Sequence, residues 1–419
     1  MQAIYSLIDR IERHYKTDVS GLIKGSFWLY LMRAAQIVLA LVSAVAFANW
    51  LPKEVYGSYR YVLSVYAILS IVTLPGINAA VTQAAAQGVD GALIAGLRKQ
   101  MTFATLGSLA TLGIAGYYFL LGNPLIGFAF VIVAASIPFF DTLDLFTNYL
   151  EGKLRFKEEM WLRTLMQAIS VAFLVLAAYL TNSLLWILAA YFIPYIVTRL
   201  LMHWWIVRKD RIKEGEGGRA AITFGYHLSA MEVLNQLGSN ADRLIIWHVL
   251  GPAALAVYSI AAAPVIELRS VLLTVTTVIL PKFVKQGIEQ VRASIYSRLL
   301  YYWILVLAAT TAYVLAAPYI FHLLFPLYSD SIVYTQLFAV VMIFLPKNIL
   351  ALTFLTHVKI KENYIENVLS NGSRILFCFI LIPMWGLLGA IAAFLISQVV
   401  DGIVTWYLFE QMRSTPTKV

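Results

Sequence analysis

Charge is scarce in this chain. Only 13% of its 419 residues are charged, whereas 61% are hydrophobic, and the mean hydropathy is +0.78. A soluble protein needs far more polar surface, so most of this surface must face lipid. Apolar runs of about twenty residues recur from end to end, each long enough to cross a hydrocarbon core of roughly 30 Å as a helix. The alternating pattern of a membrane β-barrel is absent, so we expect an all-α polytopic membrane protein.

Cysteines and nucleotide-binding motifs are also lacking. Cys378 is the single cysteine, which excludes intramolecular disulfides and a cysteine metal cage. No G-x-x-x-x-G-K-[ST] sequence occurs, so the chain is not an ATP-driven pump by itself. The six histidines show no metal-ligand spacing. We therefore expect no metal site, no catalytic residues and no cofactor other than a coupling proton or sodium ion.

The hydropathy pattern predicts twelve transmembrane helices. They lie near residues 26–50, 59–86, 101–121, 124–150, 161–181, 183–207, 222–249, 253–280, 297–318, 331–356, 364–384 and 386–409. Prolines at Pro75 and Pro138 are expected to kink or break their spans, because proline removes a backbone hydrogen bond. Such breaks are useful where a lobe must bend, but membrane helices also tolerate them without a special purpose.

The net charge of +9 has a topological source rather than a nucleic-acid one. Basic residues collect at every second loop, whereas the opposite loops hold only Lys53 and Arg60. By the positive-inside rule both termini are cytoplasmic, as an even number of spans requires. We expect a multi-pass protein of the bacterial inner membrane with no nucleic-acid partner.

The longest basic loop also divides the chain. Residues 208–219 form a polar, glycine-containing linker between a lobe at 26–207 and a lobe at 220–410, each of six helices. Residues 1–25 are expected to form a cytoplasmic amphipathic segment, and residues 411–419 a cytoplasmic tail. An internal repeat supports the division, because LPKEVYGSYRYVLS (51–64) aligns without a gap to LGPAALAVYSIAAA (250–263). Repeats of six helices are parallel, related by a pseudo-two-fold axis along the membrane normal.

Charged residues inside the predicted spans are the strongest functional signal. The basic ones are Arg33, Arg199, Arg243, Arg269, Lys347 and Arg374, and the acidic ones are Asp141, Asp144, Glu232, Asp242, Glu267 and Asp401. A charge at the bilayer centre costs about 2.5–3.5 kcal/mol or more, so these side chains require a polar interior, which we expect as a central cavity.

Two interpretations of these charges remain open. In the first, five basic residues bind an anionic substrate, namely Arg33, Arg243, Arg269, Lys347 and Arg374. Four acidic residues then bind a coupling ion or pair between helices, namely Asp141, Glu232, Asp242 and Glu267. In the second, all of them form structural ion pairs or extend to the membrane interface, as we expect for Arg199, Asp144 and Asp401 near span ends.

Helical geometry separates two adjacent charges in the seventh span. At 100° per residue, Arg243 lies about 20° from Glu232, near the centre of a polar face, whereas Asp242 lies about 100° from Arg243. The two side chains are therefore not expected to pair. We expect Arg243 to face a cavity and Asp242 to face a neighbouring helix.

Two sets of motifs are typical of one family. The first helix pair carries Leu51 and then a G-x-Y pattern at Gly57 and Tyr59, and the second half carries Asp242-Arg243, Leu250-Gly251 and Tyr258-Ser259-Ile260-Ala261. In these motifs the chain resembles the Wzx-type polysaccharide and O-antigen flippases. These flippases belong to the multidrug/oligosaccharidyl-lipid/polysaccharide (MOP) superfamily. The resemblance implies ion-coupled alternating access that moves an undecaprenyl-diphosphate-linked oligosaccharide to the periplasmic leaflet for lipopolysaccharide or related polysaccharide synthesis. It also implies a polysaccharide polymerase and a chain-length regulator as partners.

Two other functions remain as alternatives. A cation-coupled drug antiporter of the same superfamily would share the fold and the two lobes, and six intramembrane acids are compatible with it. A membrane-embedded polymerase or glycosyltransferase is less favoured, because the predicted outer loops are too short to build a catalytic site. We therefore expect a transporter rather than an enzyme.

Overall fold

The computed structural model describes residues 19–213, 215–284, 288–356 and 360–411, and these contain helices but no strand. The α-helices are α2 (Val19–Trp50), α3 (Lys53–Leu69), α4 (Gly76–Ala86), α5 (Ala92–Leu120), α6 (Pro124–Phe140), α7 (Leu145–Gly152), α8 (Phe156–Leu180), α9 (Leu184–Lys209), α10 (Glu216–Leu250), α11 (Pro252–Val284), α12 (Ile288–Leu324), α13 (Ser331–Ala339), α14 (Lys347–Thr356) and α15 (Ile360–Gln411). Four short 3₁₀ segments join them: η1 (Ser70–Thr73), η2 (Thr142–Asp144), η3 (Pro326–Tyr328) and η4 (Val340–Phe344). The all-α prediction is confirmed.

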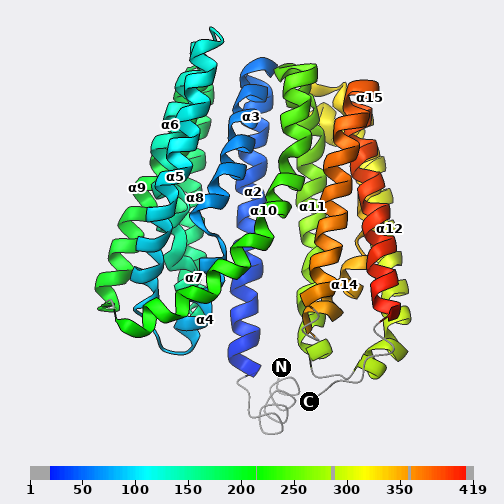
Figure 1. Cartoon of the computed structure of the whole chain (residues 1–419). Helices are drawn as coiled ribbons and strands as arrows, with labels where there is room; N and C mark the ends of the chain where they lie inside the picture. Colours follow the sequence, from blue (N-terminus) through cyan, green and yellow to red (C-terminus); the bar gives the residue numbers. More distant parts are fainter. Residues whose placement is uncertain (1–18, 214, 285–287, 357–359, 412–419) are drawn as a thin grey trace. The chain divides into compact units, whose positions relative to one another are not determined.

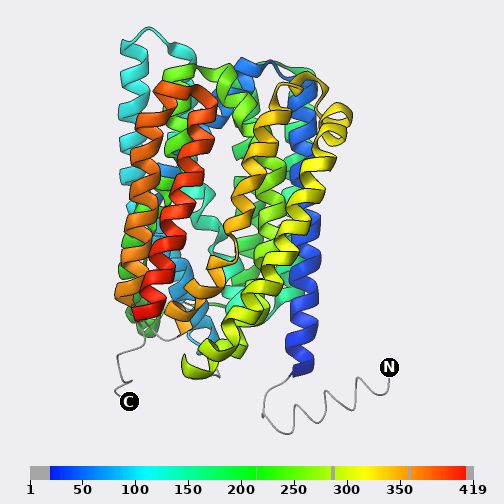
Figure 2. The same ribbon diagram turned by 90° about the vertical axis from the view of Figure 1, so that its right-hand side faces the viewer.

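Every predicted span coincides with helical structure. The last two spans lie within α15, where Gly386 has a non-helical backbone (φ 60°, ψ −133°) that separates them. Figures 1 and 2 show the two parts of α15, orange and red, running side by side. Among the described residues, nine helices are long and apolar enough to cross a membrane, or ten if the bent pair α13–α14 is one span. The protein is therefore a multi-pass membrane protein, and the number twelve stays a prediction.

Both predicted proline breaks occur. After η1 the chain turns at Leu74, which has a left-handed backbone (φ 60°), and α4 begins directly after Pro75. Beyond Pro138, α6 ends at Phe140 and the chain continues through η2 into α7. At this second break the Thr142 hydroxyl donates to the Pro138 carbonyl, which replaces part of the interrupted helical bonding.

The first compact unit comprises residues 1–43, 69–181 and 185–230, of which the structure describes those from 19 on, apart from 214. In this unit α5 packs along α6, as Figure 1 shows, and α4 packs against α7. Gly152 permits the second contact, since a Cβ at this position would lie 2.8 Å from the Cβ of Ala85. Phe146 and Tyr149 of α7 fill the core beside Ile77 of α4.

The second compact unit comprises residues 44–68, 182–184 and 231–419, apart from those outside the described ranges. Here α11 packs against α13 and α14, and α14 packs against α15. The start of α3 lies against the start of α11, because a Cβ on Gly57 would come within 3.0 Å of the Cα of Pro252. Gly57 and Pro252 belong to the two copies of the predicted repeat, which therefore meet inside one unit.

These units differ from the predicted lobes. The units interleave along the sequence, so that residues 44–68 pack with the C-terminal helices, whereas the predicted lobes at 26–207 and 220–410 are consecutive. The lobe boundaries, the linker at 208–219 and the central cavity stay predictions. The amphipathic segment predicted at 1–25 falls mainly outside the described residues, and so does the tail from residue 412 on.

Candidate functional site

Charged residues of the second unit gather around a cavity of about 180 Å³. Helix α10 contributes Asp242 and Arg243 to its lining, α11 contributes Arg269, and α15 contributes Arg374. Three aromatic residues also line it, namely Tyr258, Phe338 and Phe394. The cavity thus joins residues that are up to 155 positions apart in sequence, from Ser239 to Phe394 (394 − 239).

Asp242 connects three helices. Its side chain is buried, with one carboxylate oxygen accepting a hydrogen bond from the Arg374 Nη2 at 2.9 Å and from the Tyr258 hydroxyl at 2.6 Å. The other oxygen accepts from the backbone N–H of Arg243 at 2.8 Å. Charge-assisted bonds of this kind are stronger than neutral ones, so Asp242 holds α10, α11 and α15 together.

Arg243 points away from this ion pair. Its Nη1 donates to Oδ1 of Asn240, one turn earlier on α10, at 3.0 Å. Only its backbone contacts Asp242, as the 100° separation on the helix predicts. Arg60 on α3 is a further positive charge that acts on Arg243 electrostatically.

Arg269 forms no ion pair with any residue that the structure describes. Its guanidinium carbon lies 5.9 Å from the centre of the Phe394 ring, and its Nε has no hydrogen-bond partner. The Arg374 guanidinium carbon lies 4.2 Å from the centre of the same ring. The negative face of an aromatic ring offsets part of the repulsion between two guanidinium groups, but it does not neutralise them.

The cavity therefore carries an excess of positive charge. Three arginines and one aspartate line it, which gives a formal charge of +2 (3 − 1). Arginine presents N–H groups in a fork that matches the oxygens of carboxylates and phosphates. This arrangement can bind an anion with delocalised charge, and Arg269 has donors free to do so.

Lys347 lies elsewhere in the second unit. It forms a buried ion pair with Asp401, so this acid does not extend to the interface as the sequence predicts. Glu366 adds a second negative charge that acts on Lys347 and accepts a hydrogen bond from the Thr405 hydroxyl at 3.2 Å. A contact between Lys347 and substrate stays a prediction.

The other predicted site residues lie outside the cavity. Glu232 accepts hydrogen bonds from Asn235 and Gln236 of its own helix at 3.3 and 3.4 Å. Glu267 is half-buried on α11. Arg33 on α2 and Asp141 after α6 are half-buried in the first unit. The structure thus brings together four of the nine predicted residues, namely Asp242, Arg243, Arg269 and Arg374, and the roles of all nine stay predictions.

The first unit has its own ion pairs. Arg199 contacts Asp144 at 3.4 Å, donates to the Phe140 carbonyl and covers the Phe140 ring at 4.3 Å. The break after Pro138 thus brings Asp144 and the Phe140 carbonyl to Arg199 on α9, and the expectation that Arg199 and Asp144 extend to the membrane interface stays a prediction. In the described residues no group of three or more His, Cys, Asp or Glu could hold a metal ion.

Sequence reasoning missed several residues of the second unit. Arg60 is grouped with the charges of the outer loops although it falls at the start of the span predicted at 59–86, and the structure places it on α3. Glu366 falls near the start of the span predicted at 364–384 and is a further intramembrane acid beyond the six named from the sequence. The sequence marks Tyr258 only as part of a motif. Because Asp242 belongs to the same set of motifs, this shared membership is a signal that the two side chains are in contact.

Comparison with known proteins identifies the family. Residues 22–286 match the family described as "Polysaccharide biosynthesis protein". The chain belongs to this family. No curated protein matches the sequence at a significant level.

Solved structures establish the fold of this polysaccharide biosynthesis family member. The lipid II flippase MurJ in an inward closed conformation superposes with a TM-score of 0.70 at 13% identity, covering 94% of this chain and 88% of MurJ. A MATE transporter in complex with MaD5 gives a TM-score of 0.67 at 15% identity, covering 94% and 96%. A MOP superfamily transporter from Pyrococcus furiosus gives a TM-score of 0.63 at 14% identity, covering 94% and 95%. The protein thus has the fold of the MOP superfamily.

Proposed function

We propose that the protein is a flippase that moves an undecaprenyl-diphosphate-linked oligosaccharide from the cytoplasmic to the periplasmic leaflet of the bacterial inner membrane. The observation that carries this proposal is the cavity in which Asp242 meets Arg243, Arg269 and Arg374. Membership of the polysaccharide biosynthesis family supports a saccharide cargo. The translocated repeat unit would then reach a polymerase and a chain-length regulator for O-antigen or a related surface polysaccharide.

The chemistry of the carrier fits the excess of arginine. A diphosphate has to lose much of its hydration to cross the bilayer, and the loss is offset only where cationic donors replace water. Arg269 and Arg374 share the Phe394 ring and lie on different helices, so one diphosphate can accept from both. A small cationic drug would instead be repelled by the formal charge of +2 that the lining carries.

Substrate binding at this cavity would change the state of Asp242. A phosphate that accepts hydrogen bonds from Arg374 competes with the Asp242 carboxylate, which now accepts from it at 2.9 Å. A carboxylate that loses its cationic partner in an apolar site binds a proton more readily. Asp242 thereby links anion binding to proton uptake, and Asp141, Glu232 and Glu267 are further candidates for a coupling proton or sodium ion.

Deletion of the gene tests the function. We expect lipid-linked repeat units to accumulate in the cytoplasmic leaflet and surface polysaccharide to be lost, with recovery on expression of the full chain. Accessibility of the saccharide to an added periplasmic enzyme in spheroplasts reports the leaflet directly. Normal translocation in the deletant would contradict the proposal. Loss of drug resistance without any change in polysaccharide would instead assign the protein to cation-coupled drug export.

A further inference from the structure

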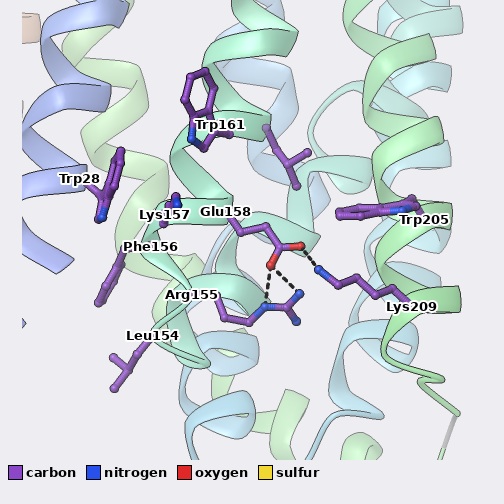
Figure 3. Close-up of a pocket in the computed structure, with 10 residues that line it drawn as sticks. Trp28, Leu154, Arg155, Phe156, Lys157, Glu158, Trp161, Trp205 and Lys209 are labelled. Atoms are coloured by element: carbon purple, nitrogen blue, oxygen red, sulfur yellow. Dashed lines mark hydrogen bonds and ion pairs between the residues drawn. The ribbon is translucent and has the colours of Figure 1, made fainter. Parts of the chain in front are cut away.

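The first unit contains a second, larger cavity that the proposed transport step does not use. It has a volume of about 610 Å³ and lies where the start of α8 meets α2 and the end of α9 (Figure 3). Its lining consists of Trp28, Leu154, Arg155, Phe156, Lys157, Glu158, Trp161, Leu162, Trp205 and Lys209. The lining thus combines three tryptophans with three cations.

One side of this cavity is held in place by ion pairs. Figure 3 shows the Glu158 carboxylate between Arg155 and Lys209, and both nitrogen–oxygen distances are 2.6 Å. Arg155 also pairs with Asp210. Lys209 lies 4.5 Å from the centre of the Trp205 ring, so the cationic groups of this side are oriented by their partners.

Lys157 has no acidic partner among the residues that the structure describes. Its ammonium lies 5.3 Å from the centre of the Trp28 ring, which gives a cation–π contact but leaves the charge unneutralised. The lining holds three cations, Arg155, Lys157 and Lys209, but only one carboxylate, that of Glu158. The cavity therefore suits an anionic group.

The rim of the cavity is apolar and exposed. Leu154 is 66% exposed, and Trp161 is 59% exposed. Tryptophan is enriched where a membrane protein meets the lipid headgroups, and basic residues beside a span attract anionic lipids. A free phosphate ion would satisfy the cations but would leave this apolar rim uncovered.

We propose that this cavity, which we call the α2/α8/α9 site, binds the headgroup of an anionic glycerophospholipid. The phosphodiester lies between Lys157 and the Arg155–Lys209 side, and the acyl chains extend along Leu154 and Trp161. The site shares no lining residue with the candidate transport cavity, so the experiment on lipid binding tests it independently of the proposed function.

Lipid binding to the purified full chain tests the proposal. Native mass spectrometry in a neutral detergent, titrated with phosphatidylglycerol or with phosphatidylcholine, measures a Kd for each lipid. We expect Lys157→Gln to weaken phosphatidylglycerol binding about fivefold, the effect of roughly one basic residue at a membrane surface, and to leave phosphatidylcholine binding unchanged.

Lys99→Gln is the matched control. Lys99 is also an exposed lysine of the first unit, with its ammonium 5.4 Å from the Phe103 ring and 5.8 Å from the Tyr226 ring, but it does not line the cavity. Glu158→Gln should tighten phosphatidylglycerol binding, because it releases Lys209 from its carboxylate. Equal effects of Lys157→Gln and Lys99→Gln, or weaker binding in Glu158→Gln, would overturn the site. Inorganic phosphate that competes for the site with the same affinity as phosphatidylglycerol would assign the site to free phosphate and overturn lipid binding.

Discussion

Asp242, which is buried, forms an ion pair 2.9 Å long with the half-buried Arg374, although the two lie 132 positions apart in sequence on α10 and α15. The neighbour of Asp242 in sequence, Arg243, does not take part with its side chain. Tyr258 supplies the third member of this cluster. The D-[KR] and Y-S motifs of the second half are therefore parts of one contact between three helices.

Asp242→Asn should destabilise the protein severely. The amide keeps the shape of the carboxylate but leaves the Arg374 guanidinium buried without a counter-charge, a change that costs about 3–5 kcal/mol in the free energy of unfolding. Thermal unfolding of the purified protein in detergent measures the loss. Asp330→Asn is the control, because Asp330 is 77% exposed and 3.8 Å from Lys53, where a pair contributes about 1 kcal/mol or less. Equal losses in both variants would show that the buried pair has no special weight.

Arg269→Gln should separate transport from stability. Arg269 has no ion pair within the described residues, so its removal relieves an uncompensated charge and leaves the unfolding temperature unchanged or higher. If its guanidinium binds the substrate diphosphate, export should fall by about tenfold or more, the effect of one lost charge-assisted hydrogen bond of about 1.5–3 kcal/mol. Surface polysaccharide is measured at matched protein levels.

Arg374→Gln provides the comparison for Arg269→Gln. It breaks the Asp242 pair, so both export and unfolding temperature should fall. Undiminished export in Arg269→Gln, with the protein present at its normal level, would rule out a diphosphate contact at this residue.

Lys347 and Asp401 should behave as a structural pair. Lys347→Met leaves Asp401 without its cation in a buried site and should lower the free energy of unfolding by about 3–5 kcal/mol. The double variant Lys347→Met/Asp401→Leu should recover most of this loss, because two apolar side chains can replace a buried pair. A double-mutant cycle gives the coupling energy, and a value near zero would contradict the pairing.

Much of the fold follows from local sequence, but the pairing of charges does not. Run length predicted the helices, and proline chemistry predicted the breaks after Thr73 and Phe140. The 100° rotation per residue predicted that Asp242 and Arg243 diverge, because that geometry lies within one helix. By contrast, the pairing of Asp242 with Arg374, and that of Lys347 with Asp401, depends on how helices that are distant in sequence pack. The pairing of Arg199 with Asp144 likewise depends on a break in another span, which brings the two side chains together.

Gly57→Ala should disrupt the contact between α3 and α11. The added Cβ would lie 3.0 Å from the Cα of Pro252 and still closer to its carbonyl group, and backbone atoms cannot move aside as a side chain can. We expect a loss of about 1–3 kcal/mol in the free energy of unfolding. Gly113→Ala on α5 is the control, because no atom lies within 4 Å of its Cβ position and alanine favours a helix over glycine by roughly 1 kcal/mol. A neutral result at both positions would show that α3 and α11 can separate slightly at no cost.

The polar character of α10 affects how the protein enters the membrane. Among the described residues, α10 is not one of the helices apolar enough to span alone. Each charge on it opposes insertion by about 2.5–3.5 kcal/mol at the bilayer centre. Asp242 can reach Tyr258 as soon as α11 is synthesised, but its cationic partner Arg374 emerges only with α15.

Newly made α10 must therefore remain at the insertion machinery, or beside α11, until most of the chain has been translated. A nascent chain stalled before α15 should release α10 from the membrane more readily than the full-length protein does. Biogenesis of this protein then depends on the order in which its helices appear at the ribosome, and not only on the contacts that they finally make.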